Sequence, residues 1–289
     1  MILVTGASGR SGGAVTRAVA ARGGRVRTFV RRPEAAEACR RNGAAEVAVG
    51  TLESDAEVRA AMAGIERVYH VAPPFSPAEE AYGRRLLAAA AAEGVRHFVF
   101  HSVYHAQCTA MVHHRLKLAV EVAVIESGLP YTVLQPAMYM QNIAVEWPEI
   151  VATGKYRRPY SPDVKMAVVD LEDVAAAAAT VLAGDAFVGG SFELSSAPAL
   201  SHAEMAEALS RELGRPVVAE RRTFEDWAEK ARARFGPEAI EIYGAMCRHY
   251  DAHGLPGGND QVLRLILGRA PTGFPAFLAR FAASRRATA

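Results

Sequence analysis

A short apolar run at residues 2–5 leads directly into three glycines at positions 6, 9 and 12, and a stretch of helical length follows. Gly6 permits a tight turn, Gly9 lets the backbone approach a bound pyrophosphate, and Gly12 allows close packing of the helix on the strand. The N–H groups and the dipole of a helix N-terminus attract phosphate. Because a strand and a helix flank the glycines, the segment predicts a dinucleotide-binding turn.

Beyond this turn, β-rich runs alternate with Ala-rich runs of helical length. Such alternation is typical of βαβ units, a parallel sheet and right-handed crossovers. The sequence therefore predicts an α/β fold with a doubly wound parallel Rossmann sheet. The predicted strands are Ile2–Thr5, Arg25–Val30, Glu46–Val49, Arg67–Val71, His97–Ser102, Tyr131–Leu134 and Ser191–Leu194. The predicted helices include Ala14–Ala21, Asp55–Ala63, Pro77–Glu93 and Val112–Ser127.

Residues that favour helix ends mark the boundaries of these helices. Pro33 suits a first helical turn, and Asp55 and Asp170 suit N-cap positions. Glycines lie where helices should stop, at positions 64, 94 and 128.

Two domains are expected, because the alternation loosens in the second half. Residues 1–136 with 165–196 should form the dinucleotide-binding domain, and 137–164 with 197–289 a smaller, mostly helical, substrate-side lobe. We predict no strand in the last ninety or so residues. Ligands of doubly wound sheets bind at the carboxyl ends of the strands, so we expect the substrate in a cleft between sheet and lobe.

Composition and motifs exclude several classes of function. A net charge of +2 with interleaved signs offers no basic stripe for nucleic acid. The Ala-rich runs Leu86–Ala92 and Ala175–Ala179 are too short to cross a bilayer. No Gly-x-Ser-x-Gly elbow or phosphate-binding lysine loop is present, which argues against hydrolases and NTPases.

The start of the chain and its cysteines suggest a compartment. An apolar strand follows Met1 directly and leaves no room for a signal peptide. The 3 cysteines are widely spaced and form no CxxC pattern. We expect reduced thiols in a cytoplasmic protein.

The end of the second predicted strand indicates which dinucleotide is bound. An acidic residue about 20 positions after the glycines would bind the ribose 2′-hydroxyl of NAD. Arg31 and Arg32 stand there instead. Guanidinium groups suit a 2′-phosphate through charge and forked donors, so NADP(H) is favoured over NAD(H). The alternative is that both are solvated arginines at a strand end.

Several motifs together resemble the NmrA-like family of atypical short-chain dehydrogenases and reductases. The resemblance spans nearly the whole chain. It rests on Thr5-Gly-x-x-Gly-x-x-Gly, His97-Phe-Val-Phe-His-Ser-Val, His113-x-x-x-Lys117, Ser127-Gly-Leu-Pro-Tyr-Thr-Val-Leu-Gln-Pro, Tyr139-x-x-Asn142, Val169-Asp170-Leu-Glu-Asp173-Val-Ala, His249-Tyr-Asp-Ala-His-Gly-Leu and Leu267-Gly-Arg-Ala-Pro.

The resemblance implies an NAD(P)-binding Rossmann protein. Members of the family include reductases, quinone oxidoreductases and redox-sensing regulators. Lys117 corresponds to the lysine that hydrogen-bonds the nicotinamide ribose. The expected cofactor-binding residues are Gly6, Ser8, Gly9, Arg10, Ser11, Gly12, Arg31, Arg32, Ala72, Lys117 and Pro136.

The chain departs from the family pattern at three positions. His113 stands where short-chain dehydrogenases have the tyrosine of Tyr-x-x-x-Lys, which weakens a claim of ordinary carbonyl reduction. Gln135 replaces the usual arginine before Pro136. Thr51 replaces an acidic residue after the third strand.

His113, Lys117 and Ser102 are the expected catalytic residues. Residues four apart share a helix face, so His113 and Lys117 should project together. Imidazole titrates near neutral pH, so His113 either donates a proton to the reduced substrate or merely lines the cleft. Ser102 either polarises the substrate or caps the end of a strand.

A metal site is not expected, although 6 of the 9 histidines lie between positions 70 and 114. Along a strand, at about 3.3 Å per residue, histidines four apart are too distant to bind one ion. Side chains at strand ends and in the lobe suit a pocket for a flat or apolar substrate. These are Phe75, Tyr104, Met138, Tyr139, Asn142 and Trp147.

The sequence favours an NADPH-dependent oxidoreductase that transfers hydride to a small carbonyl, quinone or imine. The alternative is an NADP(H)-binding redox sensor without turnover, acting through a homodimer or a protein partner. A third possibility, an epimerase or dehydratase, is less favoured because Tyr-x-x-x-Lys is incomplete. No nucleic acid, membrane or metal partner is expected.

Overall fold

The chain's computed structural model describes residues 1–233 and 235–286 and divides into two units. The first unit holds residues 1–109, 114–136 and 172–193. The second unit holds residues 110–113, 137–171 and 194–289, of which 234 and 287–289 lie outside the described residues.

The first unit is built on a seven-stranded sheet in the order β10-β6-β5-β4-β1-β2-β3. Its strands are β1 (Ile2–Thr5), β2 (Val26–Val30), β3 (Glu46–Val49), β4 (Arg67–His70), β5 (His97–His101), β6 (Tyr131–Pro136) and β10 (Gly190–Leu194). Its helical segments are α1 (Arg10–Ala20), η1 (Pro33–Ala35), α2 (Ala36–Arg41), α3 (Asp55–Met62), α4 (Glu79–Ala92), α5 (Val112–Glu126) and α7 (Leu171–Ala183).

Strand β1 lies at the topological switch point of this sheet. It pairs in parallel with β2 on one side and with β4 on the other. The chain extends through β2 and β3 in one direction and through β4, β5 and β6 in the other. The predicted doubly wound Rossmann sheet is confirmed, and ligands of such sheets bind beside the carboxyl ends of the strands at this point.

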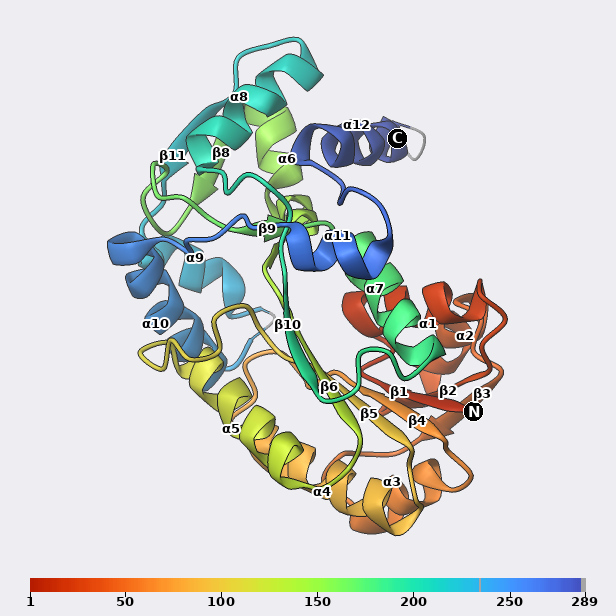
Figure 1. Cartoon of the computed structure of the whole chain (residues 1–289). Helices are drawn as coiled ribbons and strands as arrows, with labels where there is room; N and C mark the ends of the chain where they lie inside the picture. The colour runs from red at the N-terminus through yellow and green to blue at the C-terminus, as the bar shows by residue number, and fades with distance from the viewer. Residues whose placement is uncertain (234, 287–289) are drawn as a thin grey trace. The chain divides into compact units, whose positions relative to one another are not determined.

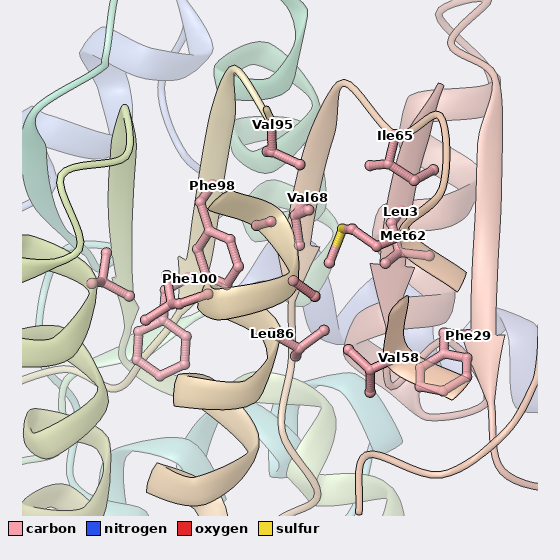
Figure 2. Packing of buried hydrophobic residues seen from close by; sticks show 14 of the residues in the cluster. Leu3, Phe29, Val58, Met62, Ile65, Val68, Leu86, Val95, Phe98 and Phe100 are labelled. Carbon is pink, nitrogen blue, oxygen red and sulfur yellow. The ribbon is translucent and has the colours of Figure 1, made fainter. Parts of the chain in front are cut away.

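Alternate strand residues pack beneath three helices on one face of the sheet. Leu3, Val68 and Phe98 point into a buried cluster, which Met62 of α3 and Leu86 of α4 complete (Figure 2). Figure 1 shows α3, α4 and α5 on this face. Full burial of such a side chain contributes about 1.5–3 kcal/mol, so this layer holds the strand ends rigidly.

The predicted strands match the observed ones to within one or two residues. Helix α1 begins at Arg10, earlier than predicted, because Gly12 of the turn and Gly13 already lie within the helix. The N-cap of α3 is Ser54, not Asp55. Ser54 has an extended backbone, and its hydroxyl accepts a hydrogen bond from the Glu57 N–H at 3.3 Å. The helix-ending glycines at 64, 94 and 128 have φ of +69°, +68° and +71°, as a left-handed end requires.

The second unit combines helices with two small sheets. Its helical segments are η2 (Met140–Asn142), α6 (Ile143–Thr153), α8 (His202–Leu213), α9 (Phe224–Ala231), α10 (Pro237–His253), α11 (Gln261–Leu267) and α12 (Phe274–Arg286). Its strands are β7 (Met138–Tyr139), β8 (Lys155–Arg158), β9 (Val168–Val169) and β11 (Val218–Arg221). A separate core includes Ile150 of α6, Leu209 of α8 and Phe277 of α12, helices that lie side by side in Figure 1.

Two features of the second unit differ from the sequence-based expectation. Residues 165–171 and 194–196 belong to it and not to the Rossmann unit, because β9 pairs with β7 through Met138 and Val168. Strand β11, which was not predicted, pairs in parallel with β8. Within residues 1–233 and 235–286, no helix combines the length and the hydropathy needed to span a bilayer.

Candidate functional site

The glycine turn between β1 and α1 is shaped by close backbone contacts. Gly6 has φ of +61°, and a Cβ there would lie 2.8 Å from the Val71 carbonyl oxygen. A Cβ on Gly12 would lie 2.5 Å from the Gly6 carbonyl oxygen. The Gly9 N–H donates to that same oxygen at 2.9 Å. Gly6 and Gly12 are therefore required by the turn itself.

Gly9 has a different environment. It is exposed, it is the N-cap of α1, and a Cβ there would lie 3.2 Å from the Gly6 carbonyl oxygen, with no other described residue beyond its chain neighbours within 4 Å. No acidic residue lies in the first turn of α1, and no side chain caps it. The positive end of the helix dipole is thus open to an anion, and the residues present fit a dinucleotide pyrophosphate.

We predict that Gly9→Val abolishes NADPH binding in titration calorimetry while the melting temperature stays nearly unchanged, because the new side chain occupies the pyrophosphate space. Gly12→Ala is the contrasting variant. Its Cβ meets backbone at 2.5 Å, so it should lower the melting temperature as well. Unchanged NADPH affinity of Gly9→Val would contradict the assignment.

Arg31 and Arg32 follow β2 directly and are both exposed. Among the described residues, neither has a carboxylate within ion-pair distance. Arg32 is the N-cap of η1 but makes no capping hydrogen bond. Both guanidinium groups therefore suit the predicted 2′-phosphate. Of the other predicted cofactor residues, Ser8 and Arg10 are exposed, Ser11 is half-buried, and Ala72 and Pro136 are buried at the carboxyl ends of β4 and β6.

Lys117 on α5 is almost completely buried in an ion pair. Its Nζ lies 2.5 Å from Glu79 Oε1, and the two side chains are 6% and 0% exposed. Nζ also donates to the His101 carbonyl oxygen at 3.2 Å and lies 5.3 Å from the centre of the Phe100 ring. Contact of Lys117 with a nicotinamide ribose stays a prediction. In such a contact, Nζ would bind the ribose while it remains paired with Glu79.

Ser102, the residue after β5, belongs to a second buried polar group. Its Oγ donates a hydrogen bond to Glu121 Oε1. The Gln135 side-chain amide donates to both Glu121 oxygens, at 2.8 and 3.0 Å. Burial raises the pKa of the Glu121 carboxyl, although Ser102, Gln135 and Lys117 all act to lower it.

Two histidines at the strand ends are locked in their neutral forms. His70 Nδ1 lies 2.8 Å from Thr5 Oγ1, and His101 Nδ1 lies 2.5 Å from the Tyr69 hydroxyl. Burial, with the nearby Lys117 charge, lowers the pKa of each to about 3. Within the described part of the chain, no group of histidine, cysteine or acidic side chains is arranged to hold a metal ion.

Two loop residues with left-handed backbones lie at this edge of the sheet. Phe75 follows β4 with φ of +57°, and His105 follows β5 with φ of +54°. Such strain costs about 1–3 kcal/mol and is concentrated at functional sites. Tyr104, next to His105, is buried, and its N–H donates to the Pro136 carbonyl oxygen at 3.0 Å. Phe75 and Tyr104 therefore lie in the first unit, in loops at the carboxyl ends of β4 and β5.

The other predicted substrate-side residues belong to the second unit. His113 is half-buried, Met138 and Tyr139 form β7, and Asn142 ends η2. Trp147 packs edge-to-face on Phe281 at 5.0 Å, within the core of that unit. Their contacts with a substrate remain predictions.

Sequence reasoning missed two of the buried carboxylates, Glu79, which pairs with Lys117, and Glu121, which pairs with Ser102. A signal existed for Glu121, because it lies four residues after Lys117 and so shares its helix face. Glu79, in the first turn of α4, resembles any acidic residue that favours a helix N-terminus.

The fold and the glycine turn define a Rossmann-type dinucleotide-binding protein. A model of the NmrA-like family matches residues 1–258, and the chain belongs to this family. It is 35% identical over 250 residues to a (4-alkanoyl-5-oxo-2,5-dihydrofuran-3-yl)methyl phosphate reductase of Streptomyces griseus, with 84% of each chain covered. It is 30% identical to an NAD(P)H azoreductase of Xenophilus azovorans, covering 98% of this chain and 99% of that one.

Among solved structures, an NADPH-dependent quinone oxidoreductase of Escherichia coli has the same fold, with a TM-score of 0.82 at 23% identity. The match covers 98% of this chain and 100% of that chain. Together with the two curated reductases, the family match makes this chain an NAD(P)-dependent oxidoreductase of the atypical short-chain type, as the sequence predicted.

Proposed function

We propose that this protein transfers hydride from NADPH to a small carbonyl, quinone or imine acceptor. One observation carries the proposal: the glycine turn at the switch point and two arginines at the end of the neighbouring strand lie in the same unit. The cofactor is NADP(H), because Arg31 and Arg32 replace the acidic residue that an NAD ribose requires.

The chain's own groups divide the work of binding and protonation. The helix N-terminus at Gly9 holds the pyrophosphate, and Arg31 holds the 2′-phosphate. Lys117 orients the nicotinamide ribose, and the reduced nicotinamide supplies the hydride when bound. Ser102 and His113 are the two groups proposed to meet the acceptor atom.

The acceptor class draws on the relatives. Their names specify an acylated furanone and an azo compound as acceptors, and the solved structure is that of a quinone oxidoreductase. All three acceptors have conjugated double bonds, which favours a flat, electron-poor acceptor here. Phe75, half-buried in the loop after β4, supplies aromatic surface for such an acceptor, whereas Tyr104 in the loop after β5 is buried.

The test is oxidation of NADPH by the purified protein, followed by absorbance, with a panel of quinones, aldehydes and cyclic imines. Turnover with at least one class of acceptor supports the proposal. The sensor alternative predicts tight NADP(H) binding with no oxidation by any acceptor, so the same assay separates the two functions.

Arg31→Ala should weaken NADPH binding by about ten- to a hundred-fold and leave NADH binding nearly unchanged, because a charged hydrogen bond contributes about 1.5–3 kcal/mol. Arg25→Ala is the matched control, since Arg25 is an exposed arginine just before the other end of β2. Titration calorimetry with both cofactors measures the effect. Equal weakening of both cofactors would make Arg31 structural and move the 2′-phosphate contact to Arg32 or Arg10.

A further inference from the structure

Resting on the proposed function, we infer that Glu121 holds the proton that the reduction consumes and passes it to the acceptor through the Ser102 hydroxyl. Ser102 is the residue that meets the acceptor, and Glu121 acts through it. The sequence predicted roles for His113 and Lys117 of α5, but for no residue of this helix that follows Lys117.

The geometry makes Ser102 a donor only when Glu121 is protonated. A charged carboxylate can only accept hydrogen bonds, so the Ser102 hydroxyl hydrogen must then point at Glu121. In that state Ser102 can only accept hydrogen bonds, and it cannot donate one to the acceptor atom. With a proton on Glu121, the carboxyl O–H can donate to Ser102 Oγ, and the serine hydrogen is released toward the acceptor.

Burial is the largest influence on Glu121 and favours its protonated form, although the Ser102 and Gln135 hydrogen bonds and the Lys117 charge oppose it. Gln135 contacts both oxygens of Glu121 but carries no charge. Lys117, one helical turn earlier, is already paired with Glu79. Glu193 of β10 adds a repelling charge. Glu121 is 5% exposed and Ser102 is 3% exposed.

The proton and electron balance closes with groups already named. The acceptor gains a hydride, with its electron pair, from NADPH, which becomes NADP⁺. The acceptor oxygen or nitrogen takes the Ser102 hydroxyl proton as that O–H bond breaks. Ser102 Oγ takes the proton of the Glu121 carboxyl, which ends as a carboxylate held by the Gln135 amide. Water re-protonates Glu121 before the next cycle.

The first test needs no turnover. Infrared difference spectra of the cofactor-free protein, recorded through a pH titration, should show the carbonyl band of a buried protonated carboxyl that persists above the pH at which exposed glutamates ionise. Glu121→Gln should remove this band. Glu126→Gln, which changes an exposed glutamate on the same helix, should leave it in place. If no carboxyl band persists above that pH in the wild-type protein, the proposal is overturned.

The second test shifts the pKa of the Glu121 carboxyl without removing the carboxyl. Gln135→Arg places a cation beside Glu121 and should shift the titration of the band to lower pH, whereas Gln135→Met removes a donor and should shift it upward. The alkaline limb of the kcat profile should move in the same direction as the band in each variant. If the alkaline limb of the kcat profile lies at the same pH in Gln135→Arg and Gln135→Met, the proposal is overturned.

The rate of the loaded enzyme gives the third readout. Because the protonated acid is the donor, kcat of the wild type should fall as pH rises through the Glu121 pKa. Glu121→Gln should lower kcat about 10²–10⁴-fold below that pKa, with little change in KM, and should lose the limb. The double variant Ser102→Ala/Glu121→Gln should be no slower than the slower single variant, because the two act as one unit.

The outcomes separate this inference from the proposed function. If no acceptor oxidises NADPH, the proposed function fails whatever the infrared band shows. If turnover is robust but His113→Phe removes the alkaline limb while Glu121→Gln keeps it, the reductase stands and the proton comes from His113. That result overturns the inference alone.

Discussion

Between pH 7 and pH 5, the free energy of unfolding should fall by about 2 kcal/mol for each of three buried histidines in the first unit. These are His70 and His101, with pKa values lowered to about 3, and His97, lowered to about 4, in each case mainly by burial. Together they remove about 6 kcal/mol, which is comparable to the whole stability of an ordinary domain.

The sign follows from where the protons go. Each histidine of the unfolded chain takes up a proton below pH 6.5, whereas the folded chain does not until pH 3 or 4. The unfolded state therefore binds more protons in this window and is favoured as the pH falls. The result depends on the unfolded pKa alone, because the window lies above all three folded values.

His97 shows the structural reason. Arg67 donates to its Nδ1 at 3.0 Å, and its Nε2 lies 2.8 Å from Thr132 Oγ1. The Thr132 hydroxyl donates its hydrogen to the Phe187 carbonyl oxygen, so it can only accept from His97. His97 Nε2 therefore carries the proton, and Nδ1 accepts the hydrogen bond from Arg67. A second proton on Nδ1 would point at the guanidinium.

Urea unfolding at pH 7 and pH 5 measures the effect. His97→Gln and His101→Asn should each flatten the pH dependence by about 2 kcal/mol, whatever they do to absolute stability. His253→Asn, at an exposed position at the end of α10, should leave the dependence unchanged. The raised pKa of Glu121 acts in the opposite sense, so the comparison between variants isolates the histidines. Identical slopes for all four proteins would contradict the prediction.

Breaking the Glu79–Lys117 pair should cost about 3–5 kcal/mol of unfolding free energy, because removal of one partner leaves the other charge buried and unpaired. The carboxylate of Glu79 is fully buried and has no hydrogen bond from any described residue, so Lys117 is its compensating charge. Glu79→Gln and Lys117→Met should each show this loss in urea unfolding.

The double variant distinguishes a pair from two independent residues. Glu79→Gln/Lys117→Met should cost clearly less than the two single losses combined, since no charge is left unpaired. Glu80→Gln is the control. Its carboxylate pairs with Arg84 at the surface, and such a pair contributes only about 0.3–0.5 kcal/mol. Additive losses in the double variant would show that the ion pair carries no coupling.

The same variants clarify the cofactor role of Lys117. In the single variant, weaker cofactor binding mixes loss of the ribose contact with the disturbance around Glu79. The double variant leaves no buried charge unpaired, so any weaker cofactor binding there reports only the loss of the ribose contact. If the double variant binds NADPH as tightly as the wild type, Lys117 serves the fold and not the ribose.

The Rossmann unit was predictable because its signals are local. The spacing of glycines 6, 9 and 12 and the period of the strands act over a few residues, and backbone sterics translate them directly into a turn and a sheet. The second unit was less so. Strand β11 is only four residues long and ends in Glu220 and Arg221, so its pairing with β8 has no alternating pattern to reveal it.

The contacts around the buried carboxylates lie beyond sequence reasoning for another reason. Glu79 and Lys117 are 38 positions apart. Their pairing depends on which helices the sheet brings together, and no local pattern in the sequence encodes that. Gln135 was recognised as a departure from the family pattern, but its partner could be identified only once β6 and α5 were in place. Long-range partners of polar groups follow from topology.

Because the N-terminus of α1 has no side-chain cap, the stability of the folded chain should depend on the concentration of the ligand that binds there. A ligand that binds there only in the folded state stabilises the chain by RT ln(1 + [L]/Kd), about 2.7 kcal/mol at a hundred times Kd. Gly9 and the acid-free first turn leave that stabilisation to the dinucleotide, since no side chain among the described residues caps the helix. The folded fraction of such a protein should therefore rise and fall with the concentration of its own cofactor.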